Sequence, residues 1–326
     1  MAKQMNICIA LNRKYVRYAY VLLTSLFYNN PQYDVHVYAL NDELNDEDNR
    51  ALGGLCATHH SDWHDMKVNP QDFLKGLPLT EMWSKETLYR LSLIDVIPDD
   101  VDRILYLDID MIVAKDIGEL YEMDFEDKYF VATRDIPTIQ PIPPEDPRYF
   151  LFRDHDFTDT YYINAGMMLW NLKELRGKYH LSSYMDVAAA HNFHIPVLDQ
   201  DLLNLVHWGQ MKYVDPFQYD CFTIITKREN DEEENGRRPK EASIIHYAGD
   251  KPWKAGLQNS ANEIWWQYAK MTPFYEEMLE EYVLASCGKE SLTSKYIQYV
   301  EENDKLKRAI EPLKTFYELH NKGLIS

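Results

Sequence analysis

The sequence predicts an α/β protein built on a mainly parallel sheet. From the N-terminus onward, short apolar stretches alternate with stretches of helical periodicity, beginning with a strand at 6–11 and a helix at 15–28. Parallel strands need a crossover between them, and a helix is the usual crossover. With 326 residues and 45% hydrophobic content, the chain is long enough for one large α/β domain or two smaller ones.

The remaining elements are expected in alternation along the chain. Gly53 and Gly54 are expected to end the second helix. Five prolines within 137–160 predict a long irregular segment of the kind that forms lids over binding sites. The expected strands are 34–40, 104–107, 129–133, 161–170 and 242–245, and the expected helices are 45–55, 82–97, 116–123 (or a turn), 172–179, 199–206 and the chain after 256.

Composition excludes several classes of protein. A formal charge of −19 argues against a general nucleic-acid binder, which needs a basic face to neutralise phosphates. The four cysteines are widely spaced, which indicates neither a disulfide framework nor a zinc cluster. The N-terminal stretch does not resemble a signal peptide, and no apolar run is long enough to span a bilayer. We therefore expect a cytoplasmic protein with at most peripheral contact to the inner face of the membrane.

Two carboxylates follow a short apolar run. Ile104, Leu105 and Leu107 predict a central strand, and Asp108 stands where that strand ends, at the edge where open α/β sheets bind ligands. Because alternate residues of an extended chain point to the same side, Asp108 and Asp110 can share one hard divalent cation. An aspartate-rich turn without a metal is the alternative interpretation.

Three further stretches carry polar residues at the ends of predicted elements. Asn164-Ala-Gly166 lies in the strand at 161–170, and His246 follows the strand at 242–245. In Leu198-Asp-Gln-Asp201, Asp199 is placed to cap a helix, although capping explains only one of the three polar residues. No Gly-x-Gly-x-x-Gly follows the first strand, so the dinucleotide-binding fingerprint is missing.

Four motifs together resemble the retaining glycosyltransferases of family 8, which include glycogenin and bacterial galactosyl- and glucosyltransferases of lipooligosaccharide synthesis. The motifs are Tyr106-Leu-Asp-Ile-Asp110, Asn164-Ala-Gly166, Leu198-Asp-Gln-Asp201 and His246-Tyr-Ala-Gly-Asp-Lys-Pro-Trp253, and the resemblance covers about residues 4–255. It implies a Rossmann-like domain of the GT-A type over 1–256, with 137–160 as a flexible lid or acceptor loop, and a helical extension over 257–326.

The resemblance also implies a role for each matching residue. Mn²⁺, with Mg²⁺ as the alternative ion, would be held by Asp108, Asp110 and His246, and the diphosphate by Gly249 and Lys251. The nucleotide would contact Ala10, Asn12, Tyr15, Asp108 and Ile109; the sugar would contact Arg90, Asn164, Asp199 and Gln200; and the catalytic residues would be Gln200, Asp199 and Lys251.

The implied reaction is the transfer of a hexose, glucose or galactose, from a UDP-sugar to a hydroxyl of a cell-surface glycan or glycolipid. Because an amide such as Gln200 is a poor nucleophile, we expect a same-face substitution in which the leaving phosphate accepts the proton of the acceptor. The chain departs from the usual pattern at three places. Asn12 replaces the common Asp, Lys14 replaces the common Asn, and one residue is missing between Gly249 and Lys251.

Two alternatives follow from these observations. The departures at Asn12, Lys14 and the Lys251 loop are compatible with a catalytically impaired nucleotide-sugar-binding protein of the same fold. A phosphatase of the haloacid dehalogenase type also places Asp-x-Asp after an apolar strand. In that family the motif lies near the N-terminus and is followed two residues later by Thr or Val, where this chain has Ile112.

Overall fold

The computed structural model describes residues 3–72, 85–223, 239–249, 251–254 and 260–287. The chain divides into two compact units, 1–252 with 258–273, and 253–257 with 274–326. Two sequence predictions lie partly outside the described residues: the start of the helix at 82–97, and the helical extension, of which the chain after 287 is not described.

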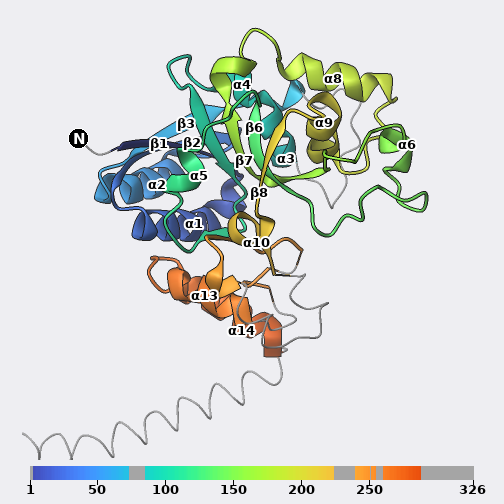
Figure 1. The fold of residues 1–326 in the computed structure, drawn as a ribbon. Coiled ribbons are helices and arrows are strands. Elements are labelled where there is room, and N and C mark those ends of the chain that lie inside the picture. The colour runs from blue at the N-terminus through green and yellow to red at the C-terminus, as the bar shows by residue number, and fades with distance from the viewer. Residues whose placement is uncertain (1–2, 73–84, 224–238, 250, 255–259, 288–326) are drawn as a thin grey trace, which may run out of the picture. The chain divides into compact units, whose positions relative to one another are not determined.

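The first unit is organised around a seven-stranded sheet in the order β3-β2-β1-β4-β7-β6-β8 (Figure 1). Every neighbouring pair is parallel except the two pairs that β7 makes, with β4 and with β6. A second, three-stranded sheet has the order β5-β10-β9. The predicted fold class, a mainly parallel mixed sheet, is therefore confirmed.

The strands are β1 (Lys3–Ala10), β2 (Tyr33–Asn41), β3 (Asp62–Lys67), β4 (Arg103–Leu107), β5 (Met111–Val113), β6 (Phe130–Arg134), β7 (Ile163–Asn171), β8 (Met211–Val214), β9 (Cys221–Phe222) and β10 (Ile244–His246). The helices of the first unit are α1 (Val16–Asn29), α2 (Asp46–Thr58), α3 (Lys85–Tyr89), α4 (Leu93–Val96), α5 (Gly118–Tyr121), α6 (Tyr149–Phe152), α7 (Leu172–Leu175), α8 (Leu181–Ala190), α9 (Leu198–Val206), α10 (Pro216–Tyr219) and α13 (Ser260–Ala269), with 3-10 turns η1 (Arg13–Tyr15), η2 (Pro70–Asp72) and η3 (Arg90–Ser92).

Helices cover both faces of the main sheet, and strand register decides which side chains each face presents. Cys8 pairs with Tyr106 and Tyr106 with Met168, so these side chains share one face, and they belong to the same buried cluster as residues of α3, α8 and α9. Ile7 and Leu105, one residue along, point to the other face, on the side of α1 and α2 (Figure 1). Because both faces are covered, the central strands read as nearly continuous apolar runs.

Two predicted helices differ from the structure. Gly53 and Gly54 do not end α2, which continues to Thr58. Each internal glycine costs about 1 kcal/mol relative to alanine, but the helix begins with a capping box at Asn45 and packs on β3, where the Trp63 indole donates to Asn49 at 2.9 Å. The capping box and the packing on β3 offset the low helix propensity of the two glycines.

The helix predicted over 82–97 is instead three short pieces, α3, η3 and α4, and the 3-10 turn between the two α-helical pieces begins at Arg90. Strands β3 and β8 and helix α8 were not predicted. Every side chain of β3 is exposed or only partly buried, and the strand is held in the sheet by pairing with β2, which a local pattern does not reveal. The segment 137–160 contains α6, whose Leu151 and Phe152 are buried.

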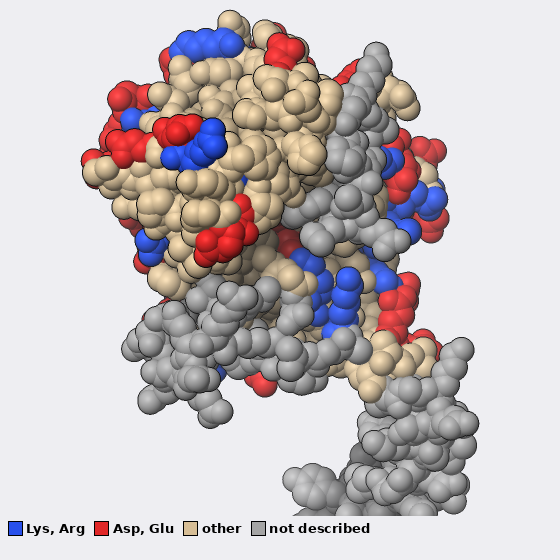
Figure 2. Space-filling model, turned by 90° about the vertical axis from the view of Figure 1, so that its right-hand side faces the viewer, with Lys and Arg blue, Asp and Glu red and all other residues tan. Residues whose placement is uncertain are grey.

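The second unit contributes one described helix, α14 (Tyr275–Cys287). Among the described residues, no helix combines the length and the hydrophobicity that crossing a bilayer requires. In the view of Figure 2, charged side chains form small groups divided by uncharged surface, and several groups contain both acidic and basic residues.

Candidate active site

The site lies at the edge of the sheet where β4 ends. Asp108 follows Leu107 directly, and its backbone N–H donates to the carbonyl of Gly166 on β7 at 2.8 Å. Two residues later Asp110 precedes β5, the first strand of the second sheet. The two aspartates therefore follow the predicted strand, and they occupy the junction between the two sheets, which was not predicted.

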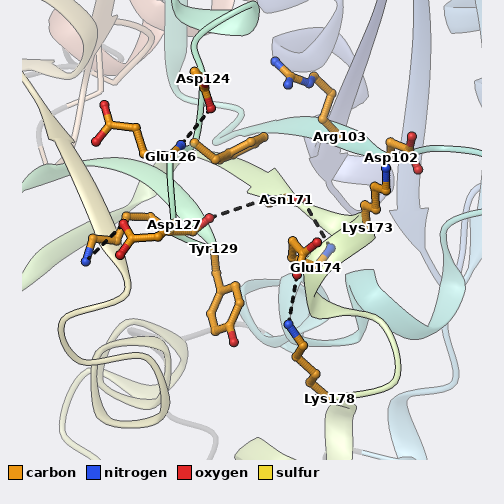
Figure 3. A pocket seen from close by; sticks show the side chains of 12 residues that line it. Asp102, Arg103, Asp124, Glu126, Asp127, Tyr129, Asn171, Lys173, Glu174 and Lys178 are labelled. Carbon is orange, nitrogen blue, oxygen red and sulfur yellow. Dashed lines mark hydrogen bonds and ion pairs between the residues drawn. The ribbon is translucent and has the colours of Figure 1, made fainter.

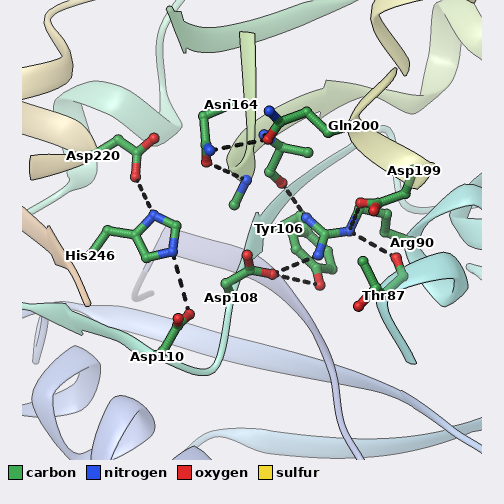
Figure 4. Close-up of polar contacts among 12 residues, drawn as sticks. Thr87, Arg90, Tyr106, Asp108, Asp110, Asn164, Asp199, Gln200, Asp220 and His246 are labelled. Atoms are coloured by element: carbon green, nitrogen blue, oxygen red, sulfur yellow. Dashed lines mark hydrogen bonds and ion pairs between the residues drawn. The ribbon is translucent and has the colours of Figure 1, made fainter. Parts of the chain in front are cut away.

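The second sheet brings His246 to the same place. β10 runs antiparallel to β5 with His246 opposite Met111, and the N–H of Tyr247 donates to the Asp110 carbonyl at 2.9 Å. His246 Nε2 lies 3.4 Å from Asp110 Oδ1. One ligand atom each from Asp108, Asp110 and His246 lie within 4.8 Å of one another. The structure thus brings the three predicted metal ligands together (Figure 4).

Gly166 is required by this close approach. A Cβ at that position would lie 2.6 Å from His246 Cε1 and 2.9 Å from Asp108 Oδ2. Both distances are below contact, and both side chains belong to the ligand cluster. The glycine of Asn164-Ala-Gly166 therefore makes room for the cluster rather than for a turn.

Arg90 lies between two carboxylates on one side of the site. Its Nη2 donates to Asp108 Oδ1 at 2.8 Å, and its Nε lies 2.8 Å from Asp199 Oδ2. The guanidinium also donates to the Ala165 carbonyl and sits over the ring of Tyr106, 4.3 Å from its centroid. Arg90 is only 5% exposed. The two ion pairs of Arg90 are therefore buried and do not lie on the protein surface.

Burial dominates the charge state of the two carboxylates that Arg90 joins. It raises the pKa of Asp199 to about 7, with Arg90 acting in the opposite direction. It also raises the pKa of Asp108. Asp199 is not a helix cap, because α9 begins after Val197 with no side-chain cap, and the Asp199 carboxylate is used by Arg90 instead.

His246 lies between two carboxylates on the other side of the site. Its Nδ1 is 2.8 Å from Asp220 Oδ1, and its Nε2 faces Asp110. Burial alone would lower the pKa of His246, but Asp110 and Asp220 raise it to about 10. Asp220 is fully buried, and its second oxygen accepts from the Thr133 hydroxyl at 2.8 Å. Asp220 was missed at the sequence level, because Tyr219-Asp-Cys221 carries no motif.

Lys251 reaches the same cluster from the segment after β10. Its ammonium group contacts Asp110 Oδ2 and donates to the Tyr247 carbonyl at 3.0 Å. Burial alone would raise the pKa of Asp110, but Lys251 and His246 hold it well below its ordinary value. Gly249, just ahead, adopts a φ of 85°, which favours glycine. Asp250, between them, lies outside the described residues.

A network of amides lines the third side of the site. Gln200 Oε1 accepts from Asn164 Nδ2 at 3.1 Å and from the Ala165 N–H at 3.0 Å, and its Nε2 faces the Tyr162 hydroxyl at 3.3 Å. The Tyr162 hydroxyl donates to Asp201 at 2.7 Å. This network fixes the Gln200 amide in one orientation.

Two buried aspartates extend this network. Asn164 Nδ2 also donates to Asp135 Oδ1 at 3.1 Å, and Asp135, after β6, is 6% exposed. Burial raises the pKa of Asp135 and takes that of Asp201 to about 6. Asp135, like Tyr162, was not singled out from the sequence, and an aspartate directly after a predicted strand was the available signal.

The predicted nucleotide residues lie at the end of β1. Ala10 is its last residue, and Asn12 accepts from the Lys14 N–H at 3.0 Å as the cap of η1. Tyr15 is half-buried and meets Tyr18 edge to face, 5.6 Å between centroids. β1 and β4 are neighbours, so these residues share the sheet edge with Asp108; Ile109 is buried.

A second hollow opens at the opposite edge of the sheet, where β4 and β6 begin and β7 ends (Figure 3). Its lining is polar, but its charges are largely matched within the protein: Lys178 contacts Glu174 at 3.0 Å and lies over the Tyr129 ring, while Arg103 donates to backbone carbonyls. It contains none of the predicted site residues, and the site at the Asp108 edge is the stronger candidate.

Residues 6–256 match the family model described as glycosyl transferase family 8. The chain belongs to this family. The resemblance inferred from the four motifs is therefore confirmed, and the phosphatase alternative is wrong.

Some bacterial relatives are named as lipopolysaccharide glycosyltransferases. A lipopolysaccharide 1,2-glucosyltransferase of Escherichia coli is 27% identical over 254 residues, which cover 76% of this chain and 73% of that protein. A lipopolysaccharide 1,3-galactosyltransferase of Salmonella typhimurium is 23% identical over 298 residues, which cover 85% and 84%.

Solved structures of family members share the fold. The galactosyltransferase LgtC, crystallised with donor and acceptor sugar analogues, superposes with a TM-score of 0.70 at 24% identity and covers 85% of this chain and 100% of its own. GlyE of Streptococcus pneumoniae gives a TM-score of 0.62 at 20% identity, covering 86% and 63%. At these identities the likeness establishes the fold, which is of the GT-A type.

Proposed function

We propose that this family 8 member transfers a hexose from a UDP-sugar to an acceptor hydroxyl, with retention at the anomeric carbon and with Mn²⁺ as cofactor. The observation that carries the proposal is the convergence of Asp108, Asp110 and His246, from two sheets, at the carboxyl edge of the main sheet. Open α/β sheets bind their ligands at this edge.

The donor set fits Mn²⁺. Two carboxylates and one imidazole suit a borderline ion better than Mg²⁺, which prefers oxygen ligands alone. Three protein ligands leave coordination positions for phosphate oxygens. When bound, the ion would neutralise the diphosphate and act as a Lewis acid on the leaving group. This also explains how a chain of charge −19 can hold a polyanionic nucleotide.

Lys251 supplies the second positive charge for the diphosphate in this proposal. Its side chain lies at Asp110, next to the ligand cluster, so the missing residue in its loop does not remove the amine from the site. A cation placed where charge develops on the leaving group stabilises the transition state.

Arg90, Asn164, Asp199 and Gln200 would surround the transferred sugar. Asp199 is buried and its carboxylate contacts Arg90 at 2.8 Å, which leaves it poorly placed as a nucleophile. The Gln200 amide is held by Asn164 and Ala165 and is uncharged. These contacts support a same-face substitution in which the leaving phosphate accepts the proton of the acceptor.

Ala10, Asn12 and Tyr15 would bind the uridine, because they end the strand next to β4. The half-buried Tyr15 ring would stack on the base. The lipopolysaccharide substrates in the names of the relatives support a cell-surface glycan or glycolipid as acceptor, with 137–160 as the acceptor loop. Glucose and galactose are both candidate sugars.

The test is a calorimetric titration with UDP in the presence and absence of Mn²⁺, on the wild type and on Asp110→Asn. We expect Asp110→Asn to lose more than about 100-fold in Mn²⁺-dependent affinity, because loss of an outer-shell partner alone costs 10–100-fold, while the fold remains intact by circular dichroism. Unchanged affinity would remove Asp110 from the metal site. Release of UDP from UDP-glucose and UDP-galactose then identifies the donor.

A nucleotide-sugar-binding protein without activity is the second candidate. The Asn12 side chain is engaged in capping η1, and Lys251 contacts Asp110 rather than lying free. Mn²⁺-dependent binding of UDP-sugars without turnover, across a panel of glycan acceptors, would establish this function instead.

A further inference from the structure

A second cluster of ligand-type side chains lies on the outer strands of the main sheet. It consists of His36 on β2 and of Asp62 and His64 on β3. One ligand atom from each lies within 4.8 Å of the other two. None of the three residues belongs to the motifs of the active site.

Strand register places the three side chains on one face. β2 and β3 are parallel, with His36 opposite Asp62 and Tyr38 opposite His64. The two histidines are thus diagonal neighbours, and Asp62 faces His36 directly. The His64 ring lies flat against Tyr38, with 4.4 Å between centroids and 10° between planes, which limits its rotation.

The two contacts of His36 Nδ1 are long for hydrogen bonds. His36 Nδ1 is 3.4 Å from His64 Nε2 and 3.5 Å from Asp62 Oδ2. Hydrogen bonds that involve a ring N–H are usually about 2.7–3.2 Å. Zinc binds imidazole nitrogen and carboxylate oxygen at about 2.0–2.2 Å, so two ligands of a tetrahedral zinc lie about 3.3–3.5 Å apart. Both separations therefore match the edge of a zinc tetrahedron.

We propose that His36, Asp62 and His64 form a second metal site, specific for Zn²⁺ or a similar imidazole-binding ion. Two imidazoles and one carboxylate favour zinc over the harder ions Mn²⁺ and Mg²⁺, whereas the active-site cluster has two carboxylates and one imidazole. Asp34 Oδ1 lies 3.9 Å from His36 Nε2, on the far side of the ring, and supplies the outer carboxylate that metal-binding histidines commonly face.

This site is separate from the active site. His36 pairs with Asn6, four residues before Ala10 at the carboxyl end of β1, which is roughly 13 Å along the strand. β3 is also the outermost strand, three positions from β4 in the sheet order. Since its ligands come from two adjacent strands, a bound ion would join the edge strand β3 to β2 and stabilise that edge.

Equilibrium dialysis of the full, untagged chain against Zn²⁺, with bound metal counted by atomic emission, tests the proposal. We expect the active-site cluster to take up zinc as well in this assay, so four proteins are compared: wild type, His64→Gln, Asp110→Ala and the double variant. We expect about two, one, one and no tightly bound ions per chain. Zn²⁺ should also raise the Tm of Asp110→Ala but not that of the double variant.

His180→Gln is the matched control, because His180 also lies beside a carboxylate, 2.8 Å from Asp95, but belongs to no cluster of ligand-type side chains among the residues that the structure describes. It should keep the wild-type zinc count. Asp62→Asn, at a 67% exposed side chain, is a second variant that spares the fold, and it too should lower the count by one. Equal zinc counts in the wild type, His64→Gln and Asp62→Asn would show a metal-free histidine pair and overturn the proposal.

Discussion

Two buried cations, Arg90 and His246, each lie between two carboxylates on opposite sides of the active site. Arg90 joins Asp108 to Asp199, and His246 joins Asp110 to Asp220. The inner carboxylates, Asp108 and Asp110, are one residue apart in the sequence. The outer ones come from α9 and from the turn before β9.

The two cations differ in whether they can lose a proton. A guanidinium keeps its proton at any accessible pH, so the Arg90 bridge is permanent and belongs to the structure. An imidazole can lose a proton and offer Nε2 to a metal, while Nδ1 still donates to Asp220. The Arg90 side of the site therefore holds its shape, and the His246 side is the one able to exchange a proton for a metal ion.

A second buried imidazole, His207, shows that the neighbouring carboxylates, not burial, raise the pKa of His246. His207, at the end of α9, has the Tyr184 hydroxyl 2.9 Å from Nε2 and aromatic rings around it. Burial lowers the pKa of His207 to about 3, whereas the pKa of His246 is raised to about 10. Two equally buried imidazoles thus shift in opposite directions.

The largest expected effect comes from breaking the Arg90 bridge. Arg90→Met leaves Asp108 and Asp199 buried without a cation, and removal of one partner from a buried ion pair costs about 3–5 kcal/mol. Urea unfolding would measure this loss. Arg153→Met is the control: Arg153 and Asp154 form an exposed pair, which should contribute less than about 1 kcal/mol. Similar losses in the two variants would contradict a structural role for Arg90.

The next effect concerns the pH dependence of stability. The pKa of His207 is about 3 in the folded chain, against about 6.5 when unfolded, so the unfolded state binds more protons between these values. Stability should fall as the pH drops below about 6.5, by on the order of 3 kcal/mol at pH 4 from this residue.

His207→Gln should flatten the change in stability between pH 6.5 and 4, measured by urea unfolding at each pH. Its stability at neutral pH will also be lower, so the slope is the readout. Tyr184→Phe keeps the imidazole and should keep the slope. A slope that is unchanged in His207→Gln would assign the acid sensitivity to other groups.

A smaller effect is expected from Asp220→Asn. The amide keeps the shape of the side chain but removes the charge that orients His246, which should weaken Mn²⁺ binding about 10–100-fold. Calorimetry with Mn²⁺ measures this loss, and an unfolding curve separates it from a change of stability. If the variant lost stability but kept the wild-type Mn²⁺ affinity, Asp220 would contribute to the stability of the core and not to metal binding.

The smallest effects concern the neutral donors that support each bridge. The Tyr106 hydroxyl donates to Asp108 at 3.1 Å, and the Thr133 hydroxyl donates to Asp220 at 2.8 Å. Tyr106→Phe and Thr133→Val should each cost about 1 kcal/mol of stability, the usual net contribution of one hydrogen bond. Tyr106→Phe should lower Mn²⁺ affinity more than Thr133→Val, because Tyr106 donates to the ligand Asp108 itself, whereas Thr133 acts on His246 through Asp220. Equal Mn²⁺ affinities in the two variants would argue against this difference.

Much of the site was visible in the sequence, and the missing part has a common physical cause. Six of the predicted site residues stand at or near the ends of strands and helices with clear periodicity, and the structure brings them together. They are Asp108, Asp110, Asn164, Asp199, Gln200 and His246. Asp220 follows α10, which was not predicted, and Asp135 follows a predicted strand but belongs to none of the four motifs. The importance of both comes from burial beside His246 and Asn164. Burial next to a distant residue leaves no periodic pattern.

The order of strands and helices, the apolar runs of the central strands and the four motifs are properties of the chain alone, and they were sufficient to predict the fold class and the family. Tertiary structure decided which cation contacts which carboxylate. Asp108 and Asp110 look equivalent in the sequence, yet one meets Arg90 and the other meets His246 and Lys251. The difference arises because β7 and α9 pack against one side of the strand end and β10 against the other, and only packing determines which charges become neighbours.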